Sequence, residues 1–213
     1  MRTISIGDNF SYEKRVGIKH YVTPEFEGIQ GTIKRVISDF IVQEISWEKE
    51  VISTFDEAKQ VDQPPHNLRR SGRKYTTFVL KKFGCDTIHA IEMLAERLQI
   101  PSDAFSFAGI KDNQAITAQQ VTIEGDWVKQ LYRIRGDLPN FEVLHIDYAS
   151  EHLNTGELWG NSFLIRIRNV ELELKQLEDQ VNKILRTLEN RGGFLNYFGL
   201  QRFGTHRPNS HRS

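Results

Sequence analysis

The most informative stretch of this chain is Phe107-Ala108-Gly109-Ile110-Lys111-Asp112-Asn113-Gln114-Ala115-Ile116-Thr117-Ala118-Gln119. An apolar segment and a glycine lead into it, and β-prone residues 120–123 follow it, so we expect a loop held by strands. Lys111 and Asp112 lie at its centre, where a charged pair contributes little to a core. A carboxylate presented in this way can act as a nucleophile. The alternative is a turn aspartate that bonds its own backbone, which composition alone favours.

Asp112 requires a neighbouring cation if it is to stay ionised in a closed site. Lys111 is adjacent in sequence, but successive side chains on a strand point to opposite sides, so the cation can come from elsewhere. Lys34, which precedes the apolar run at Phe40, is a candidate supplier of that charge.

The elements expected around this stretch are mostly strands. Apolar and β-branched runs predict strands over residues 31–45, 75–81, 120–124, 141–148 and 163–169, with a turn at 159–162. Helical spacing predicts helices over residues 87–98, capped by Asp86 or Thr87, and over 171–190, ended by Gly192-Gly193. A helical turn is expected at 101–103, and a loop or short helix over 125–140. The apolar stripe of the last helix (Leu174, Leu177, Val181, Ile184 or Leu185, and Leu188) is expected to contact a core. This order indicates an α+β fold with a mixed, mostly antiparallel sheet and helices packed on one face.

Composition bounds the class of protein. The 213 residues are 38% hydrophobic and 26% charged, which suits one large or two small globular domains. No apolar run approaches the ~20 residues of a membrane span. Cys85 is the only cysteine, which excludes an internal disulfide and favours a reducing compartment. Residues 1–30 are expected to form an irregular lead-in, and residues 48–74 a long polar loop.

Charge is segregated although the formal net charge is zero. Residues 66–82 and 191–213 contain basic side chains and no acid; these include Arg69, Arg70, Arg73, Lys74, Arg202 and Arg207. Such segregation can create one basic face for a polyanion. Solvated loops are the alternative for either run. His206 and His211 lack a clear third ligand, so no metal site is expected.

Two further segments combine amides, aromatics and glycines. Asn161 and Phe163 follow Gly160, and an amide with a ring can orient and stack a base. The alternative is a tight turn that opens a strand with a core phenylalanine. The second segment interleaves aromatics with Arg202, a pattern suited to flipped or single-stranded bases, or else to a glycine-rich turn in a core. Its residues are Asn196, Tyr197, Phe198, Gly199, Gln201, Arg202, Phe203 and Gly204.

Together these segments resemble the TruD family of pseudouridine synthases. The matching motifs are Lys34 with Asp39-Phe40-Ile41-Val42-Gln43-Glu44-Ile45; Phe78-Val79-Leu80-Lys81-Lys82 with Asp86-Thr87; Phe107-Ala108-Gly109-Ile110-Lys111-Asp112 with Ala115, Thr117 and Gln119; Gly156 and Leu158 with Gly160-Asn161-Ser162-Phe163; and Asn196-Tyr197-Phe198-Gly199 with Gln201-Arg202-Phe203-Gly204. The resemblance covers about residues 16–211, and the motifs occur in the family's order.

The resemblance implies an isomerase that converts uridine to pseudouridine in RNA, usually at position 13 of tRNA, without metal or organic cofactor. It implies that Asp112 is the catalytic carboxylate, that Phe163 stacks on the target base and that Asn161 orients the aspartate and the base. It implies supporting charge from Lys34, with Lys111 adjacent. Residues 31–213 would form part of the catalytic domain. RNA, most simply tRNA, is the expected partner of a monomer without membrane contact, in the cytoplasm or, in a eukaryote, the nucleus.

One departure from the family pattern is the position of the Arg202-Phe203-Gly204 motif near the end of this chain rather than at mid-chain. The chain is therefore expected to be the N-terminal part of a longer protein, without the family's inserted second domain. A non-catalytic RNA-binding fragment is the main alternative function. A carboxylate hydrolase acting on nucleosides is a weaker one, and it would release free base.

Overall fold

The structure is a computed structural model that describes residues 4–5, 20–55, 64, 72–135 and 138–195. The chain divides into two compact units, one formed by residues 36–166 and the other by residues 1–35 together with 167–213.

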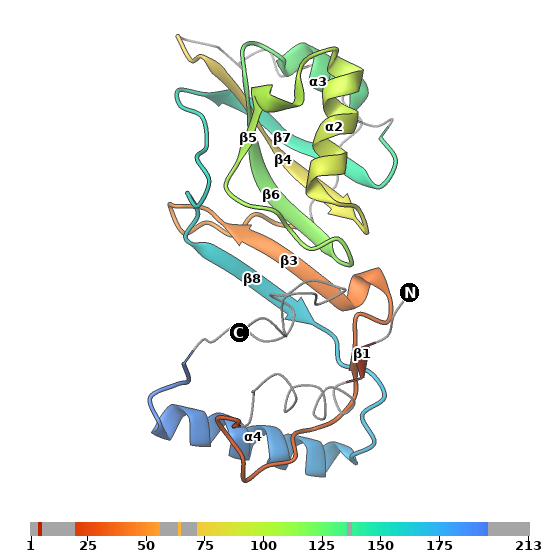
Figure 1. Cartoon of the computed structure of the whole chain (residues 1–213), viewed down its shortest axis with the longest axis vertical. Coiled ribbons are helices and arrows are strands. Elements are labelled where there is room, and N and C mark those ends of the chain that lie inside the picture. The colour runs from red at the N-terminus through yellow and green to blue at the C-terminus, as the bar shows by residue number, and fades with distance from the viewer. Residues whose placement is uncertain (1–3, 6–19, 56–63, 65–71, 136–137, 196–213) are drawn as a thin grey trace, which may run out of the picture. The chain divides into compact units, whose positions relative to one another are not determined.

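The unit of residues 36–166 is built on a six-stranded sheet with strand order β7-β4-β6-β3-β8, and β5 pairs with β6 beside that path (Figure 1). Its strands are β3 (Phe40–Ile45), β4 (Tyr75–Phe83), β5 (Phe105–Phe107), β6 (Ile116–Glu124), β7 (Phe141–Ala149) and β8 (Gly160–Ile165). The β3–β6 pair is parallel and the other pairs of this sheet are antiparallel. The prediction of a mixed, mostly antiparallel sheet is confirmed.

Two helices of this unit, α2 (Thr87–Leu98) and α3 (Val128–Ile134), cover one face of the sheet (Figure 1). The Asp86 carboxylate caps α2, accepting a hydrogen bond from the backbone N–H of Ile88 at 2.9 Å. The core between helices and sheet includes, among others, Phe78 and Leu80 of β4, Val121 and Ile123 of β6, Ile91 and Leu94 of α2, and Leu131 of α3. Strand residues two apart share a face, so this list identifies the helix-covered face of the sheet.

Lys82 continues the Phe78–Leu80 series on the helix-covered face and is fully buried. Its neighbour Lys81 belongs to the other face, where its ammonium group lies 3.3 Å from a carboxylate oxygen of Glu142. The helix-covered face thus places a lysine where the strand pattern calls for an apolar core residue.

The strand predicted over residues 31–45 is interrupted. β2 (Thr32–Ile33) is followed by Lys34, whose φ of 56° is left-handed, and a 3-10 turn at Ile37–Asp39 precedes β3. The buried Asp39 carboxylate accepts a hydrogen bond from the backbone N–H of Val36 at 3.1 Å and so closes that turn. A local side-chain bond therefore competes successfully with strand pairing here.

Two strands begin earlier than their local sequence predicts. β8 includes residues 160–162, predicted to form a turn, because they pair one to one with Ile45, Glu44 and Gln43 of β3. β6 includes residues 116–119, which lie buried or half-buried between β3 and β4. β8 ends at Ile165 rather than at residue 169. Each of the two early starts reflects a cross-strand partner, which local propensity does not reveal.

The unit of residues 1–35 and 167–213 contains β1 (Ile4–Ser5), which pairs antiparallel with β2, and the helix α4 (Leu174–Asn190). α4 is followed by left-handed Gly192 and Gly193, as predicted. Of the predicted stripe, Leu177, Val181, Ile184 and Leu188 are half-buried, whereas Leu174 and Leu185 are exposed. No residue of α4 is fully buried in the described part of the chain, so the contact of its stripe is partial. Within the described residues, no helix combines the length and apolar composition that crossing a membrane would require.

Candidate active site

Asp112 lies on the loop of residues 108–115, which connects β5 to β6. Backbone hydrogen bonds fix both ends of this loop: Gly156 N–H donates to the Ala108 carbonyl at 2.7 Å, and Gly84 N–H donates to the Ala115 carbonyl at 3.0 Å. Asp112 itself is half-buried. The expectation of a loop held by strands is confirmed, and the carboxylate is carried by a backbone fastened at each end.

A buried threonine and a buried glutamine hold the middle of the loop. Thr87 Oγ1 accepts a hydrogen bond from Lys111 N–H at 3.1 Å and donates one to Gln119 Oε1 at 3.1 Å. Gln119 Nε2 donates to the Gly109 carbonyl at 2.9 Å. Helix α2 and strand β6 therefore both bind the backbone just before Asp112.

The Lys111 side chain is directed to β3. Its ammonium group lies 2.5 Å from Glu44 Oε2, and Glu44 Oε1 accepts a hydrogen bond from Gln120 N–H at 3.0 Å. Both members of the pair are almost completely buried. A buried ion pair needs further hydrogen bonds to offset the desolvation of its charges, and the bond from Gln120 N–H to Glu44 is one of these. The charge of Lys111 is thus committed to Glu44.

Lys82 is the cation whose ammonium group reaches the backbone of Asp112. Its Nζ donates to the carbonyls of Cys85 at 2.8 Å, Lys111 at 3.3 Å and Asp112 at 2.6 Å. Burial lowers the pKa of Lys82 from 10.5 to about 8, although the charges of Cys85, Asp86 and Asp112 oppose that shift. In the sequence Lys82 is one residue of a basic run, for which no separate role is predicted. Its place in the Phe78–Leu80 series is the signal that could have identified it.

Asn161 and Phe163 lie on the edge strand β8, on the same sheet face as Glu44. Asn161 is the register partner of Glu44, and Phe163 is the partner of Val42. Residues directly opposite on paired strands share a face, and so do residues two apart on one strand. The amide and the aromatic ring therefore share a face with the carboxylate that holds Lys111.

The ring of Phe163 is 54% exposed and packs edge-on against Phe40, with ring centroids 5.9 Å apart and planes at 62°. Phe40 is buried in a small cluster with Val42 and Ala115. Ala115 is the last residue of the loop that carries Asp112. Phe163 is thus supported by side chains that also contact this loop, and part of its ring remains free to stack on a ligand.

The other predicted site residues are placed as follows. Lys34 is buried and belongs to the unit of residues 1–35 and 167–213. Arg73 lies 3.5 Å from an Asp147 carboxylate oxygen and donates to the Tyr148 carbonyl, whereas Lys74 is exposed. The remaining predicted residues lie outside the described part of the chain: Arg69, Arg70, Asn196, Tyr197, Phe198, Gly199, Gln201, Arg202, Phe203, Gly204 and Arg207.

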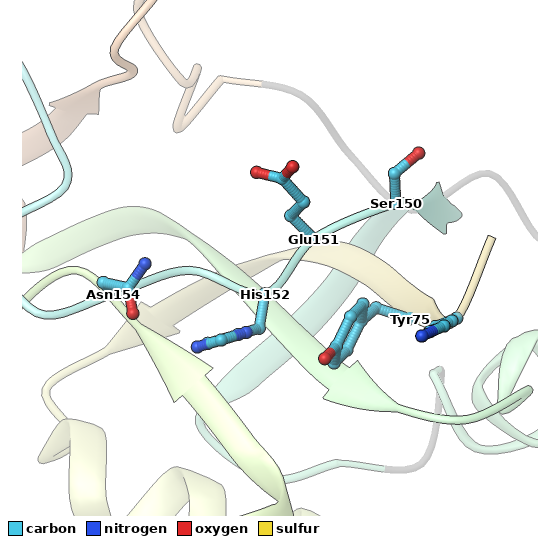
Figure 2. A pocket seen from close by; sticks show the side chains of 6 residues that line it. Tyr75, Ser150, Glu151, His152 and Asn154 are labelled. Atoms are coloured by element: carbon cyan, nitrogen blue, oxygen red, sulfur yellow. The ribbon is translucent and has the colours of Figure 1, made fainter.

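A separate hollow lies at the Tyr75 end of β4, away from Lys82 near the other end of that strand (Figure 2). The rings of Tyr75 and His152 line it with centroids 5.6 Å apart. Its remaining lining residues are Lys74, Ser150, Glu151 and Asn154. These residues do not include any side chain that holds the Asp112 loop.

The arrangement around Asp112 suits chemistry on a nucleoside. A carboxylate on a fastened loop can attack a sugar carbon or remove a proton from it. A half-exposed ring and an amide on β8, which β3 separates from β6, can stack a planar base and hydrogen-bond its edge.

Comparisons with known proteins give one consistent family. A family model described as tRNA pseudouridine synthase D (TruD) matches residues 15–212. "Probable tRNA pseudouridine synthase D 1" of Methanocaldococcus jannaschii is 33% identical over 196 residues, which cover 92% of this chain and 47% of that protein. "Pseudouridylate synthase 7 homolog" of Bos taurus is 35% identical over 140 residues, covering 66% of this chain and 20% of that protein.

A solved structure agrees with these sequence matches. The crystal structure of a TruD protein from Methanosarcina mazei matches with a TM-score of 0.74 and 30% identity, covering 95% of this chain and 41% of the other. The chain therefore spans less than half the length of each of these three proteins.

Proposed function

This chain belongs to the TruD family of tRNA pseudouridine synthases, and we propose that it carries the catalytic aspartate of an enzyme that isomerises uridine to pseudouridine in tRNA. The observation that supports this most directly is Asp112 on a loop fastened by buried side chains, in a sheet whose strand β8, separated from β6 by β3, carries Phe163 and Asn161 on one face. The family's usual target, the uridine at position 13, is the proposed site of modification.

The target uridine has to leave its stack before a side chain can reach its ribose, which costs a few kcal/mol. Phe163 is suited to offset much of that cost, because stacking a base on an aromatic side chain contributes about 1–3 kcal/mol. Asn161 supplies both amide donors and a carbonyl acceptor for the edge of the base or for the Asp112 carboxylate.

Asp112 then acts on the ribose of the flipped nucleoside. The bond from C1′ to N1 breaks, the uracil turns, and a new bond joins C1′ to C5. The C5 proton is released and N1 gains a proton, so product and substrate are isomers and no co-reactant is consumed. The carboxylate can form a transient ester at C1′ or remove the C2′ proton to give a glycal, and either route requires its ionised form.

Basic side chains of residues 66–82 and 191–213 are proposed to hold the tRNA phosphates. Lys74 is exposed and suited to this role, together with Arg69, Arg70, Arg202 and Arg207. Arg73 is engaged with Asp147 and the Tyr148 carbonyl, so its contribution to phosphate binding is expected to be smaller. Lys34 remains the proposed supplier of further positive charge to the site.

Tritium release from tRNA that contains 5-tritiated uridine tests this function directly, because C5 loses its hydrogen only when pseudouridine forms. The assay compares wild type with Asp112→Asn and with Asn113→Ala, in this chain and in the translated product of the complete reading frame. Loss of the general base or nucleophile should lower the rate by about 10²–10⁴-fold. Asn113, the exposed neighbour, should be replaceable without loss. Background release from the wild-type proteins would leave the RNA-binding alternative, and free uracil would indicate the hydrolase.

A further inference from the structure

Lys82 is a buried charged residue that the proposed chemistry does not use. We propose that Lys82 is a positioning residue for the isomerisation: its ammonium group fixes the backbone that carries Asp112, and turnover requires that group to be charged. This inference rests on the proposed function and assigns a role in it to a residue outside the aspartate, the ring and the amide.

The Lys82 ammonium group has as many N–H donors as there are carbonyl acceptors around it. An ammonium group has three N–H donors and no acceptor. Three carbonyls face it, two on the loop of residues 108–115 and one at Cys85, in the turn between β4 and α2. Lys82 therefore ties the loop of Asp112 to the turn that begins α2, with its shortest bond at the catalytic residue itself.

Packing alone does not explain a lysine at this position. Burying a charged group carries a desolvation penalty of several kcal/mol, which an apolar side chain on the same core face avoids. An apolar side chain would leave three carbonyls without this donor, two of them in residues 111 and 112. The buried Lys82 charge therefore lowers the stability of the fold and, in return, fixes one short segment of backbone.

Burial is the main cause that lowers the pKa of Lys82 from 10.5 to about 8. Lys111 on the loop acts in the same direction, and Cys85 and Asp86 on the turn and Asp112 on the loop oppose the shift. From β6 the register partner is Thr117, which does not titrate. The charged groups that face Lys82 thus come from the two segments that it connects.

Deprotonation of Lys82 would loosen the Asp112 loop. A neutral amine has two N–H donors for three carbonyls, and the bonds that remain lose their charge assistance. Misplacing a catalytic group by about 1 Å can lower a rate by ~10²-fold. Turnover should therefore fall as pH rises through about 8.

The first experiment uses single-turnover tritium release at saturating tRNA from pH 6 to pH 10, with the translated product of the complete reading frame. It compares wild type, Lys82→Met and Lys81→Met; Lys81 is the adjacent buried lysine on the opposite face. At pH 7, Lys82→Met should turn over about 10- to 100-fold more slowly, with tRNA affinity nearly unchanged. Its remaining rate should not change near pH 8, whereas wild type and Lys81→Met should both decline there. A wild-type rate for Lys82→Met, or an unaltered alkaline decline, would overturn the proposal.

The second experiment does not depend on activity. Amide hydrogen exchange of residues 109–115 is measured below and above pH 8 and corrected for intrinsic rates, in wild type and Lys82→Met. Protection of the wild-type loop should fall above pH 8 while that of α2 is retained, and the variant loop should be less protected at every pH. Equal protection of the loop in wild type and in Lys82→Met refutes the role of Lys82. If the variant does not fold, equal protection of the wild-type loop below and above pH 8 refutes it. A wild type that releases no tritium refutes the proposed function instead, and the exchange result then stands by itself.

Discussion

The Lys111 ammonium group and the Glu44 carboxylate form an ion pair 2.5 Å long, and their side chains are only 4% and 2% exposed. Glu44 lies on β3, the strand against which β8 pairs, so this ion pair connects the loop of Asp112 to the strand beside Asn161 and Phe163. The residue next to Asp112 therefore has a structural partner of its own, and its loss should affect folding before it affects chemistry.

Lys111→Met should lower the free energy of unfolding by about 3–5 kcal/mol, because it leaves the Glu44 carboxylate buried without its partner. Replacing both residues, as in Lys111→Met with Glu44→Leu, should restore much of that stability. Urea unfolding monitored by tryptophan fluorescence measures each change. A single variant that loses less than about 1 kcal/mol would show that solvent reaches the pair.

Phe163→Ala should affect the reaction and not the stability, since its ring is 54% exposed. Loss of stacking should weaken binding of the flipped base by about 1–3 kcal/mol, and Phe163→Tyr should retain it. Leu164→Ala is the matched control, because Leu164 is 56% exposed and the next side chain along a strand points to the opposite face. Single-turnover rates at subsaturating tRNA decide between them, and equal losses for both variants would rule out a stacking role.

Asp86→Asn should move the alkaline decline in activity to lower pH. An asparagine still caps α2, but the negative charge that raises the pKa of Lys82 is gone, so Lys82 loses its proton more readily. Asp86→Ala should show the same displacement and also lose about 1 kcal/mol of stability with the cap. A pH–rate profile that stays in place in both variants would contradict the electrostatic link between Asp86 and Lys82.

The free energy of unfolding of the wild type should rise with pH between about 8 and 10.5 relative to that of Lys82→Met. In this interval the unfolded chain keeps the Lys82 proton and the folded chain has released it, so raising the pH favours the folded state. The slope from one group is at most about 1.4 kcal/mol per pH unit. Guanidinium unfolding across this range measures it, and parallel stability profiles would show that Lys82 titrates normally in the folded protein.

The fold class could be predicted because the strongest signals in the chain are local. The apolar spacing of residues 87–98, the acidic cap at Asp86 and the glycines after Asn190 define two helices without tertiary information. Strands whose local sequence suggests a turn could not be predicted. Gly160 and Asn161 favour a turn when considered alone, and only their pairing with Ile45 and Glu44 makes them part of β8.

The site could be predicted in its chemistry but not in its support. Asp112 is conspicuous because it follows a glycine, between an apolar segment and a β-prone run. The expectation that its neighbour Lys111 contributes little to a core is wrong, because Lys111 is buried against Glu44. Lys82 resembles the surface lysines of a basic run until the register of β4 shows that it faces the helices. The tie between Lys111 and Glu44 spans 67 positions of sequence, so no local pattern indicates it.

The anchors of the Asp112 loop are Glu44, Lys82, Thr87 and Gln119, which come from four elements spread over more than a third of the chain. A ribosome-bound nascent chain that ends before β6 would lack Gln119 and the β3–β6 pairing, and would hold no ordered site. An excised peptide of residues 105–124 should lack it for the same reason. Catalytic competence would then appear late in folding, in step with the completed sheet.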